Sequence, residues 1–338
     1  MPHFKQKMTS TVTSNSIKFL IRVAVTVTIL ALILRSIDAQ QAWEVLRHAR
    51  LDLLALALLM QFGSTAISAY RWQIIMHNLD FGQPLSFYWR SYFKGMFFNQ
   101  GLPTSIGGDA LRVLDVAGRG FRKRDALYGV FVDRVIGLGA LMSLTLFAYL
   151  FGPDLLPMQI YRPILLLIAA GLIGLICAFF LRRMSWLDRY PKLAILRIIS
   201  ARLYQALSSH RLQLMASSLL IPVLAMLGFF ATGWALGLRY DLMIYFAIVP
   251  PALVLTVIPV SIAGWGVREG ALIGLFSLIG ANKTTVLMMS LLYGLTLIVV
   301  SLPGLVTFLK GRQHQPATTA HIKRPVKRPA KLTNSKNV

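Results

Sequence analysis

The sequence predicts an all-α membrane protein, a polytopic bundle of transmembrane helices with about six full spans and two re-entrant, broken-helix hairpins related as an inverted repeat. The first observation is composition: the 338 residues are 56% hydrophobic and 14% charged, whereas a soluble protein is about a quarter charged. The second is that several apolar runs reach the roughly 20 residues needed to cross a bilayer. The third is a pair of Gly-containing breaks that carry charge inside apolar surroundings.

The two breaks share a motif. Residues 101–112 read GLPTSIGGDALR, and residues 259–269 read PVSIAGWGVRE. Both give P-x-S-I-x-G-x-x-x-R at an offset of 156 residues, with the pairs Pro103/Pro259, Ser105/Ser261, Ile106/Ile262, Gly108/Gly264 and Arg112/Arg268. Because broken helices and charge at membrane depth are tolerated only inside protein or a cavity, the pair predicts a transporter binding site near the midplane. Two ordinary loops that share turn residues by chance are the alternative.

Apolar runs define the predicted spans, which form a single transmembrane domain at residues 17–309 with repeat halves at 51–151 and 212–309. Full spans are expected at 17–34, 51–70, 126–151, 163–181, 212–236 and 284–309. Arg71 and Trp72 close the second span, and we interpret them as an anchor at the membrane interface rather than as substrate contacts.

The remaining segments are polar or mixed. Residues 35–50 and 182–211 combine charge with apolar residues, at helical spacing in the second segment, so we expect amphipathic segments on the membrane surface. Residues 1–16 and 310–338 are basic and polar, and we expect a disordered amino-terminal segment and a disordered tail.

Basic residues predict the orientation. Residues 112–124, 182–211 and 310–338 hold the densest Lys and Arg, so the positive-inside rule places them, with both termini, in the cytoplasm. Residues 87–112 then begin and end inside, and residues 242–280 begin and end outside, which predicts two re-entrant hairpins with the breaks at their tips. The net charge of +23 therefore indicates membrane orientation and contact with anionic headgroups rather than nucleic acid.

The breaks have the chemistry of an anion site. Glycine-rich turns followed by a helix offer backbone N–H groups and a helix N-terminus to phosphate. Arginine suits phosphate because its planar guanidinium donates to two oxygens at once, and we expect Arg112 and Arg268 to lie close together around such a group. The predicted substrate-binding residues are Arg112, Arg268, Gly107, Gly108, Gly264, Ser105, Ser261, Asn99 and Arg134.

Three acids accompany these arginines: Asp109, Asp133 and Glu269. They have two alternative roles, either carrying a proton through a transport cycle or pairing with arginine to hold the bundle together, as Asp133 would with Arg112. An unpaired charge at the membrane centre costs roughly 2.5–3.5 kcal/mol on insertion scales, so we expect all three to face the protein interior.

Other site patterns are missing from the sequence. Cys177 is the single cysteine, which excludes a disulfide framework or a cysteine metal site within one chain. The sequence has no H-x-x-x-H, C-x-x-C, Walker A or G-x-S-x-G motif, and no predicted strand precedes the glycines as a dinucleotide site requires. We therefore expect no metal ion, no cofactor and no nucleic-acid partner, and we assign no catalytic residue.

The runs FFNQGLPTSIGGDALR and PVSIAGWGVREGA, with Arg71-Trp72 and Asp133-Arg134, resemble the flippase-like membrane family named for the transmembrane region of lysylphosphatidylglycerol synthase. The resemblance covers residues 15–310 and implies a multi-pass bacterial or archaeal inner-membrane protein linked to lipid translocation or lipid-linked envelope synthesis. The chain ends in a short basic tail where the full synthases have a soluble aminoacyl-transfer domain, so lysyl transfer is not expected.

These observations predict a flippase-type transporter that moves an anionic lipid or a lipid-linked envelope precursor across the bacterial inner membrane. Its expected partners are anionic membrane lipids or lipid-phosphate carriers, and a lipid-modifying enzyme is a further candidate. One alternative is an integral-membrane enzyme acting on a lipid-linked substrate, with Asp109 or Glu269 as general base. Another is a scaffold for an envelope lipid synthesis enzyme. The lipid, the direction of transport, the driving ion and the oligomeric state stay open.

Overall fold

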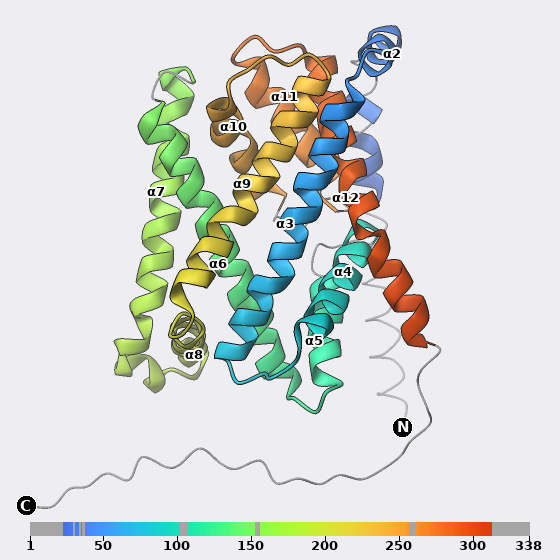
Figure 1. The fold of residues 1–338 in the computed structure, drawn as a ribbon. Helices are drawn as coiled ribbons and strands as arrows, with labels where there is room; N and C mark the ends of the chain where they lie inside the picture. Colours follow the sequence, from blue (N-terminus) through green and yellow to red (C-terminus); the bar gives the residue numbers. More distant parts are fainter. Residues whose placement is uncertain are drawn as a thin grey trace, which may run out of the picture.

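The computed structural model describes residues 23–312 except 30, 34, 36–37, 102–106, 153–155, 257–260 and 262. Over these residues all regular secondary structure is helical, which confirms the predicted all-α class (Figure 1). The elements are α2 (Ala39–Arg47), α3 (Leu51–Asn78), α4 (Leu85–Gly101), α5 (Gly107–Ala117), α6 (Lys123–Phe151), α7 (Met158–Phe180), η2 (Leu181–Arg183), η3 (Ser185–Arg189), α8 (Pro191–Ala206), α9 (Arg211–Ala235), α10 (Leu242–Leu255), α11 (Val267–Ser277) and α12 (Lys283–Arg312).

Five of these helices, α3, α6, α7, α9 and α12, are long and apolar enough to cross a membrane. They correspond to five of the predicted spans. The sixth predicted span, residues 17–34, lies partly outside the described residues, and a shorter apolar helix, Val23–Ile33, represents it. The predicted amino-terminal segment 1–16 lies outside the described residues, as does the tail from residue 313.

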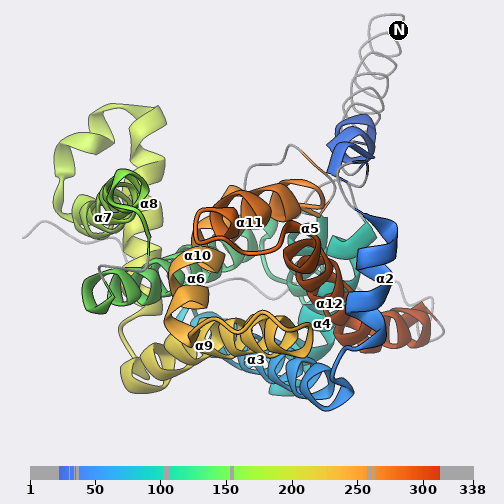
Figure 2. The same cartoon turned by 90° about the horizontal axis from the view of Figure 1, so that it is seen from above.

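The long helices connect two ends of the bundle, which we name by the helices lying there: the α2 end and the α8 end (Figure 1). Helices α3 and α9 lie side by side, and the Ser64 hydroxyl donates to the Ile221 carbonyl at 3.0 Å (Figure 2). Buried apolar side chains form one cluster around α9, α10, α11 and α12 and another around α3, α4 and α6. Two separate cores therefore stabilise the two ends.

Each end holds a short helical hairpin. Helices α4 and α5 lie at the α8 end, where Asn99 Oδ1 accepts from the Gly108 N–H at 2.7 Å and the Ser91 hydroxyl donates to Asp115 at 2.7 Å. The pairing of early with late residues shows that the two helices run antiparallel. Helices α10 and α11 form the other hairpin at the α2 end, on the opposite side of the bundle's middle (Figure 1).

The connections that lead into the two hairpins repeat local geometry at an offset of 157 residues. Helices α3 and α9 end 157 residues apart, and α4 and α10 begin 157 residues apart. In the first half the Tyr88 hydroxyl donates to the Phe81 carbonyl at 2.7 Å, and in the second the Tyr245 hydroxyl donates to the Leu238 carbonyl at 3.3 Å. The two stretches that lead into the hairpins therefore share contacts that lie outside the ten-residue motif, whereas α5 and α11 begin 160 residues apart.

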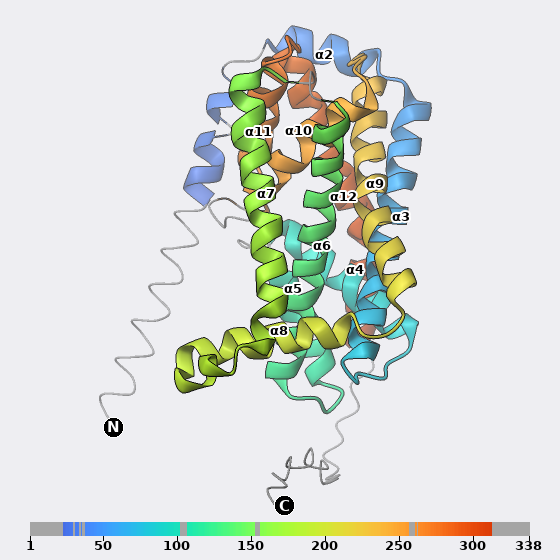
Figure 3. The same ribbon diagram turned by 90° about the vertical axis from the view of Figure 1, so that its left-hand side faces the viewer.

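Basic residues gather at the α8 end. The loop between α5 and α6 carries Arg119 and Arg122, and the first turn of α6 adds Lys123 and Arg124. Helices η2, η3 and α8 lie at the same end. Helix α8 lies across the end of the bundle at a steep angle to α7, as expected of a surface segment (Figure 3). The α2 end mixes signs, with Asp38, Glu44 and Asp52 beside Arg47 and Arg50. The charge asymmetry used to predict orientation is therefore a property of the folded molecule.

The interpretation of Arg71 and Trp72 as an interfacial anchor is wrong. Arg71 is 5% exposed and Trp72 is fully buried. The reason is that α3 continues to Asn78, so both side chains lie about two turns inside the helix and face the bundle. The predicted span ended at residue 70, whereas α3 is longer, and this added length places Arg71 and Trp72 inside the bundle.

Candidate functional site

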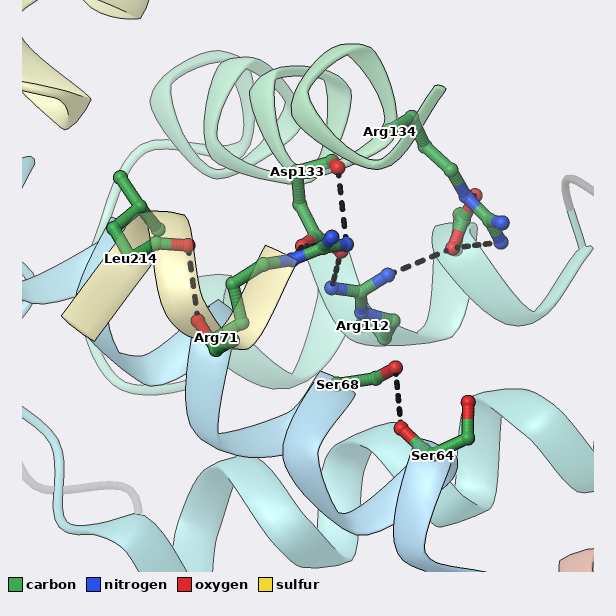
Figure 4. A network of polar contacts seen from close by, with 9 residues as sticks. Ser64, Ser68, Arg71, Arg112, Asp133, Arg134 and Leu214 are labelled. Atoms are coloured by element: carbon green, nitrogen blue, oxygen red, sulfur yellow. Dashed lines mark hydrogen bonds and ion pairs between the residues drawn. The ribbon is translucent and has the colours of Figure 1, made fainter. Parts of the chain in front are cut away.

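A buried carboxylate joins three helices at the α8 end. Asp133 of α6 accepts from Arg71 of α3, with Nε and Nη2 at 3.1 and 2.9 Å from Oδ1 (Figure 4). Its Oδ2 accepts from Arg112 Nη2 of α5 at 2.8 Å. Asp133 is 1% exposed, so its charge is neutralised by these arginines rather than by water.

The network continues from Arg112 to Asp109 and Arg134. Arg112 Nη1 donates to Asp109 Oδ1 at 3.1 Å. Arg134 donates to both oxygens of the same carboxylate, at 2.8 Å from Nε and 3.0 Å from Nη2. The five side chains, here called the arginine network, contain three guanidinium groups and two carboxylates, namely Arg71, Asp133, Arg112, Asp109 and Arg134. The network therefore carries one net positive charge.

Aromatic rings and glycines set the position of Arg112. Its guanidinium carbon lies 4.1 Å from the centroid of the Trp72 ring and 4.7 Å from that of Tyr92, within cation–π range. Helix α5 approaches α4 so closely that a Cβ on Gly108 would lie 1.9 Å from the Gly95 carbonyl oxygen. Glycine at both positions lets the hairpin close and brings Arg112 to Asp133.

The network borders a polar cavity of about 210 Å³. Its lining is Gln61, Ser64, Thr65, Ser68, Tyr92, Gly95, Met96, Asn99, Gln100, Asp109, Arg112, Arg134 and Leu297. The Arg134 side chain is 53% exposed and that of Arg112 is 3% exposed. A small anion in this cavity would therefore meet Arg134 directly, with Arg112 behind it.

A second, smaller network lies in α11 and α12. Arg268 donates to Glu269 Oε1 from Nε at 3.0 Å and from Nη2 at 2.7 Å. It also donates to the Ser290 hydroxyl and carbonyl oxygens at 3.0 and 3.1 Å. Glu269 Oε2 accepts from the Gly266 N–H at 2.6 Å, so both carboxylate oxygens are occupied. This pair is neutral and fully buried.

The predicted site residues divide between these two places. Four of them line the polar cavity: Asn99, Asp109, Arg112 and Arg134. Asp133 binds Arg112, and Gly108 binds Asn99 one residue after Gly107 begins α5. Arg268, Glu269 and Gly264, the last with φ of +80°, belong to the second hairpin. Ser261 is 4% exposed and its hydroxyl has no hydrogen-bond partner among the described residues, whereas Ser105 lies outside them.

We expected Arg112 and Arg268 to bind one group together, but they belong to two separate networks. Within the described part of the chain the hydrogen-bond partners of Arg112 and Arg268 differ, and of the two arginines Arg112 alone lines the polar cavity. A hydrogen bond on α12 links the two regions, since the Tyr293 hydroxyl lies 2.6 Å from Oε1 of Gln61, which lines the cavity. Tyr293 is less than one turn from Ser290, the partner of Arg268.

Several site residues are not among those predicted: Arg71 and Tyr92, and the polar face of α3 made by Gln61, Ser64, Thr65 and Ser68. The α3 residues recur at i, i+3, i+4 and i+7 inside an apolar run, a spacing that places them on one helix face. The spacing of these polar residues would have allowed a polar lining on this face of α3 to be predicted from the sequence. Arg71 offered no comparable signal, because its partner Asp133 lies 62 residues away.

The sequence model of a family described as the lysylphosphatidylglycerol synthase TM region matches residues 19–304. The match covers all helices from α2 to α11 and most of α12, including both networks. No curated protein sequence shows significant similarity to this chain.

Proposed function

Because this chain belongs to the family of the lysylphosphatidylglycerol synthase transmembrane region, and so is a multi-pass membrane protein of lipid metabolism, we propose that it is a flippase-type lipid transporter. It moves an anionic lipid, or a lipid-linked envelope precursor, across the bacterial inner membrane. Anionic membrane lipids or lipid-phosphate carriers are its partners.

The net positive charge of the arginine network supports this proposal most. Three guanidinium groups and two carboxylates leave one uncompensated charge beside a polar cavity in a helical membrane bundle. A monoanionic phosphodiester headgroup beside Arg134 would neutralise it. Such a group accepts from guanidinium in the bidentate geometry that Arg134 uses with Asp109.

In this proposal both hairpins are re-entrant and the two halves form an inverted repeat. Hairpin α4–α5 enters from the α8 end, which the excess of Lys and Arg places in the cytoplasm, and α10–α11 enters from the α2 end. The repeated hydrogen bonds at an offset of 157 residues support this relation. Rocking of one half against the other then exposes the cavity to the two sides in turn.

The enzyme alternative receives less support from the contacts. A general base needs a carboxylate that is free to take a proton. Both oxygens of Asp109 accept from arginine, and both oxygens of Glu269 accept from Arg268 or the Gly266 N–H. We therefore assign Asp109, Asp133 and Glu269 to structural ion pairs and to placing the arginines, rather than to proton transfer.

Arg134→Gln is expected to lower transport of phosphatidylglycerol at least tenfold while the protein stays folded. One charge-assisted hydrogen bond contributes about 1.5–3 kcal/mol, which is a factor of ten or more. The fold is expected to persist because Asp109 keeps its pair with Arg112, leaving the network neutral. The measurement is loss of headgroup accessibility in proteoliposomes containing labelled phosphatidylglycerol.

Arg239→Gln is the matched control, since Arg239 is an exposed residue in the loop between α9 and α10 and its guanidinium lies over the Trp234 ring, away from the arginine network. It is expected to transport at the wild-type rate. Wild-type transport by Arg134→Gln would contradict the proposed site. Formation of a new lipid product by the purified wild-type protein would favour the enzyme, and inertness in both assays would favour the scaffold.

Cysteine labelling tests the re-entrant topology. In a Cys177→Ser background, Gly82→Cys and Arg122→Cys flank hairpin α4–α5, and both positions are exposed. We expect an impermeant maleimide to label both from the cytoplasmic side only, because a re-entrant hairpin returns to the face it entered. Labelling of the two positions from opposite sides would show that the hairpin crosses the membrane.

A further inference from the structure

An apolar pocket of about 420 Å³ lies between α6, α7, α10 and α11, away from the arginine network. Its lining is Leu141, Met142, Thr145, Ile160, Ile164, Leu167, Ile168, Pro250, Pro251, Val254, Leu255, Ala271, Gly274 and Leu275. The one hydroxyl, that of Thr145, donates to the Leu141 carbonyl at 2.9 Å. No side chain of this lining offers a free polar group, so a hydrocarbon is the matching ligand.

The pocket borders the helix that is most exposed to the bilayer. Helix α7 has Ile168 as its one buried residue, and in the view from above it stands at the periphery of the bundle (Figure 2). Leu167 lines the pocket and is itself 67% exposed. A chain from the surrounding bilayer can therefore reach the pocket past α7 without crossing polar protein.

One face of α6 connects the pocket to the polar cavity. Leu141 and Thr145 follow Arg134 by seven and eleven residues, which places all three within about 20° of a line along the helix. At 1.5 Å per residue the pocket residues lie about 10 and 17 Å beyond Arg134. That separation suits a single lipid, with its headgroup at Arg134 and its chain further along the same face.

We infer that the apolar pocket holds a hydrocarbon chain of the same lipid whose anionic headgroup binds beside Arg134. The inference rests on the proposed function and adds a substrate class to it: a lipid recognised at both ends, by charge at the α8 half and by chain at the α2 half. For headgroup and chain to move together, the polar cavity and the apolar pocket must be open to the same lipid molecule along α6.

Gly274→Leu is the variant that tests the pocket. Gly274 lines the pocket, and a Cβ on it would meet no atom within 4 Å, so a larger side chain can begin at this position without a clash. The matched control is Gly270→Leu, one turn earlier on α11, which also has free space and does not line the pocket. Leucine has a higher helix propensity than glycine, so both variants are expected to fold.

The full chain is placed in phosphatidylcholine nanodiscs with a trace of phosphatidylglycerol that carries a photoreactive diazirine within one acyl chain. Wild-type protein is expected to be labelled on the pocket-lining segments of α6, α7 and α11. Gly274→Leu is expected to lower this labelling about tenfold, the effect of displacing about two buried methylene groups, and Gly270→Leu to leave it unchanged. Equal labelling of Gly274→Leu and wild type would overturn the inference.

A neutral diacylglycerol probe with the same chain separates the pocket from the headgroup site. It is expected to label the pocket about tenfold less than the phosphatidylglycerol probe, because it lacks the contact with Arg134. Equal labelling by both probes would overturn the link between head and chain. If Gly274→Leu keeps full labelling while Arg134→Gln lowers transport at least tenfold, the inference fails and the proposed function stands. If Arg134→Gln transports normally, the proposed function fails.

Discussion

Asp133→Asn is expected to destabilise the protein by about 3–5 kcal/mol, the range found when one partner of a buried ion pair is removed. The change would leave Arg71 and Arg112, which are 5% and 3% exposed, without their shared carboxylate. Arg71 would have no carboxylate partner, and Arg112 would keep only its bond to Asp109. Thermal or denaturant unfolding in detergent measures the loss, together with the yield of folded protein.

The same substitution elsewhere on α6 provides the control. Asp125 pairs with Arg202 at 3.3 Å, but about a third of each side chain is exposed, so Asp125→Asn is expected to cost under about 1 kcal/mol. Adding Arg71→Met to Asp133→Asn removes the guanidinium that is left without a carboxylate and is expected to recover part of the stability. Similar losses for the two asparagine variants would show that burial of Asp133 does not carry the energy assigned to it.

Gly108→Ala is expected to open hairpin α4–α5 and to abolish transport, with a loss of stability of about 3 kcal/mol, at the upper end for overpacking. The new methyl group would lie 1.9 Å from the Gly95 carbonyl oxygen and 2.7 Å from the Asn99 side chain. The helices would have to separate, which moves Arg112 away from Asp133. Unfolding midpoints and the proteoliposome assay measure the two effects.

Gly174→Ala is the control for this change. Gly174 is also helical, in α7, and an added Cβ there would meet nothing within 4 Å. Alanine in a helix is favoured over glycine by about 0.5–1 kcal/mol, so this variant is expected to be slightly more stable than wild type and to transport normally. A Gly108→Ala protein with wild-type stability and transport would contradict the close approach of α4 and α5.

Local features of the sequence determined the class of fold. Apolar run length and the positions of Gly and Pro act within a few residues of where they stand, so they predict spans and breaks without knowledge of neighbours. The polar residues of α3 at helical spacing belong to the same kind of information. The concentration of Lys and Arg in particular loops likewise indicates which ends of the helices lie together.

Tertiary structure decided which charged residues share a site. The motif treats Arg112 and Arg268 as equivalent, yet Arg112 pairs with Asp133 on the next long helix, whereas Arg268 pairs with its neighbour Glu269. The residue 157 positions after Asp133 is Ser290, which contacts Arg268 but brings no charge. One half thus carries a net positive cavity and the other a neutral pair. Each arginine's charge balance depends on what a distant helix places beside it.

The sequence by itself therefore determined an all-helical membrane bundle with two breaks rich in glycine and charge. Only the tertiary structure decided that Arg71 is buried, that Arg134 borders the polar cavity, and that an apolar pocket continues along the same face of α6. The physical reason is the distance along the chain over which each interaction acts. Helix formation and membrane insertion follow from neighbouring residues, whereas ion pairing and cavity shape follow from contacts between helices far apart in the chain.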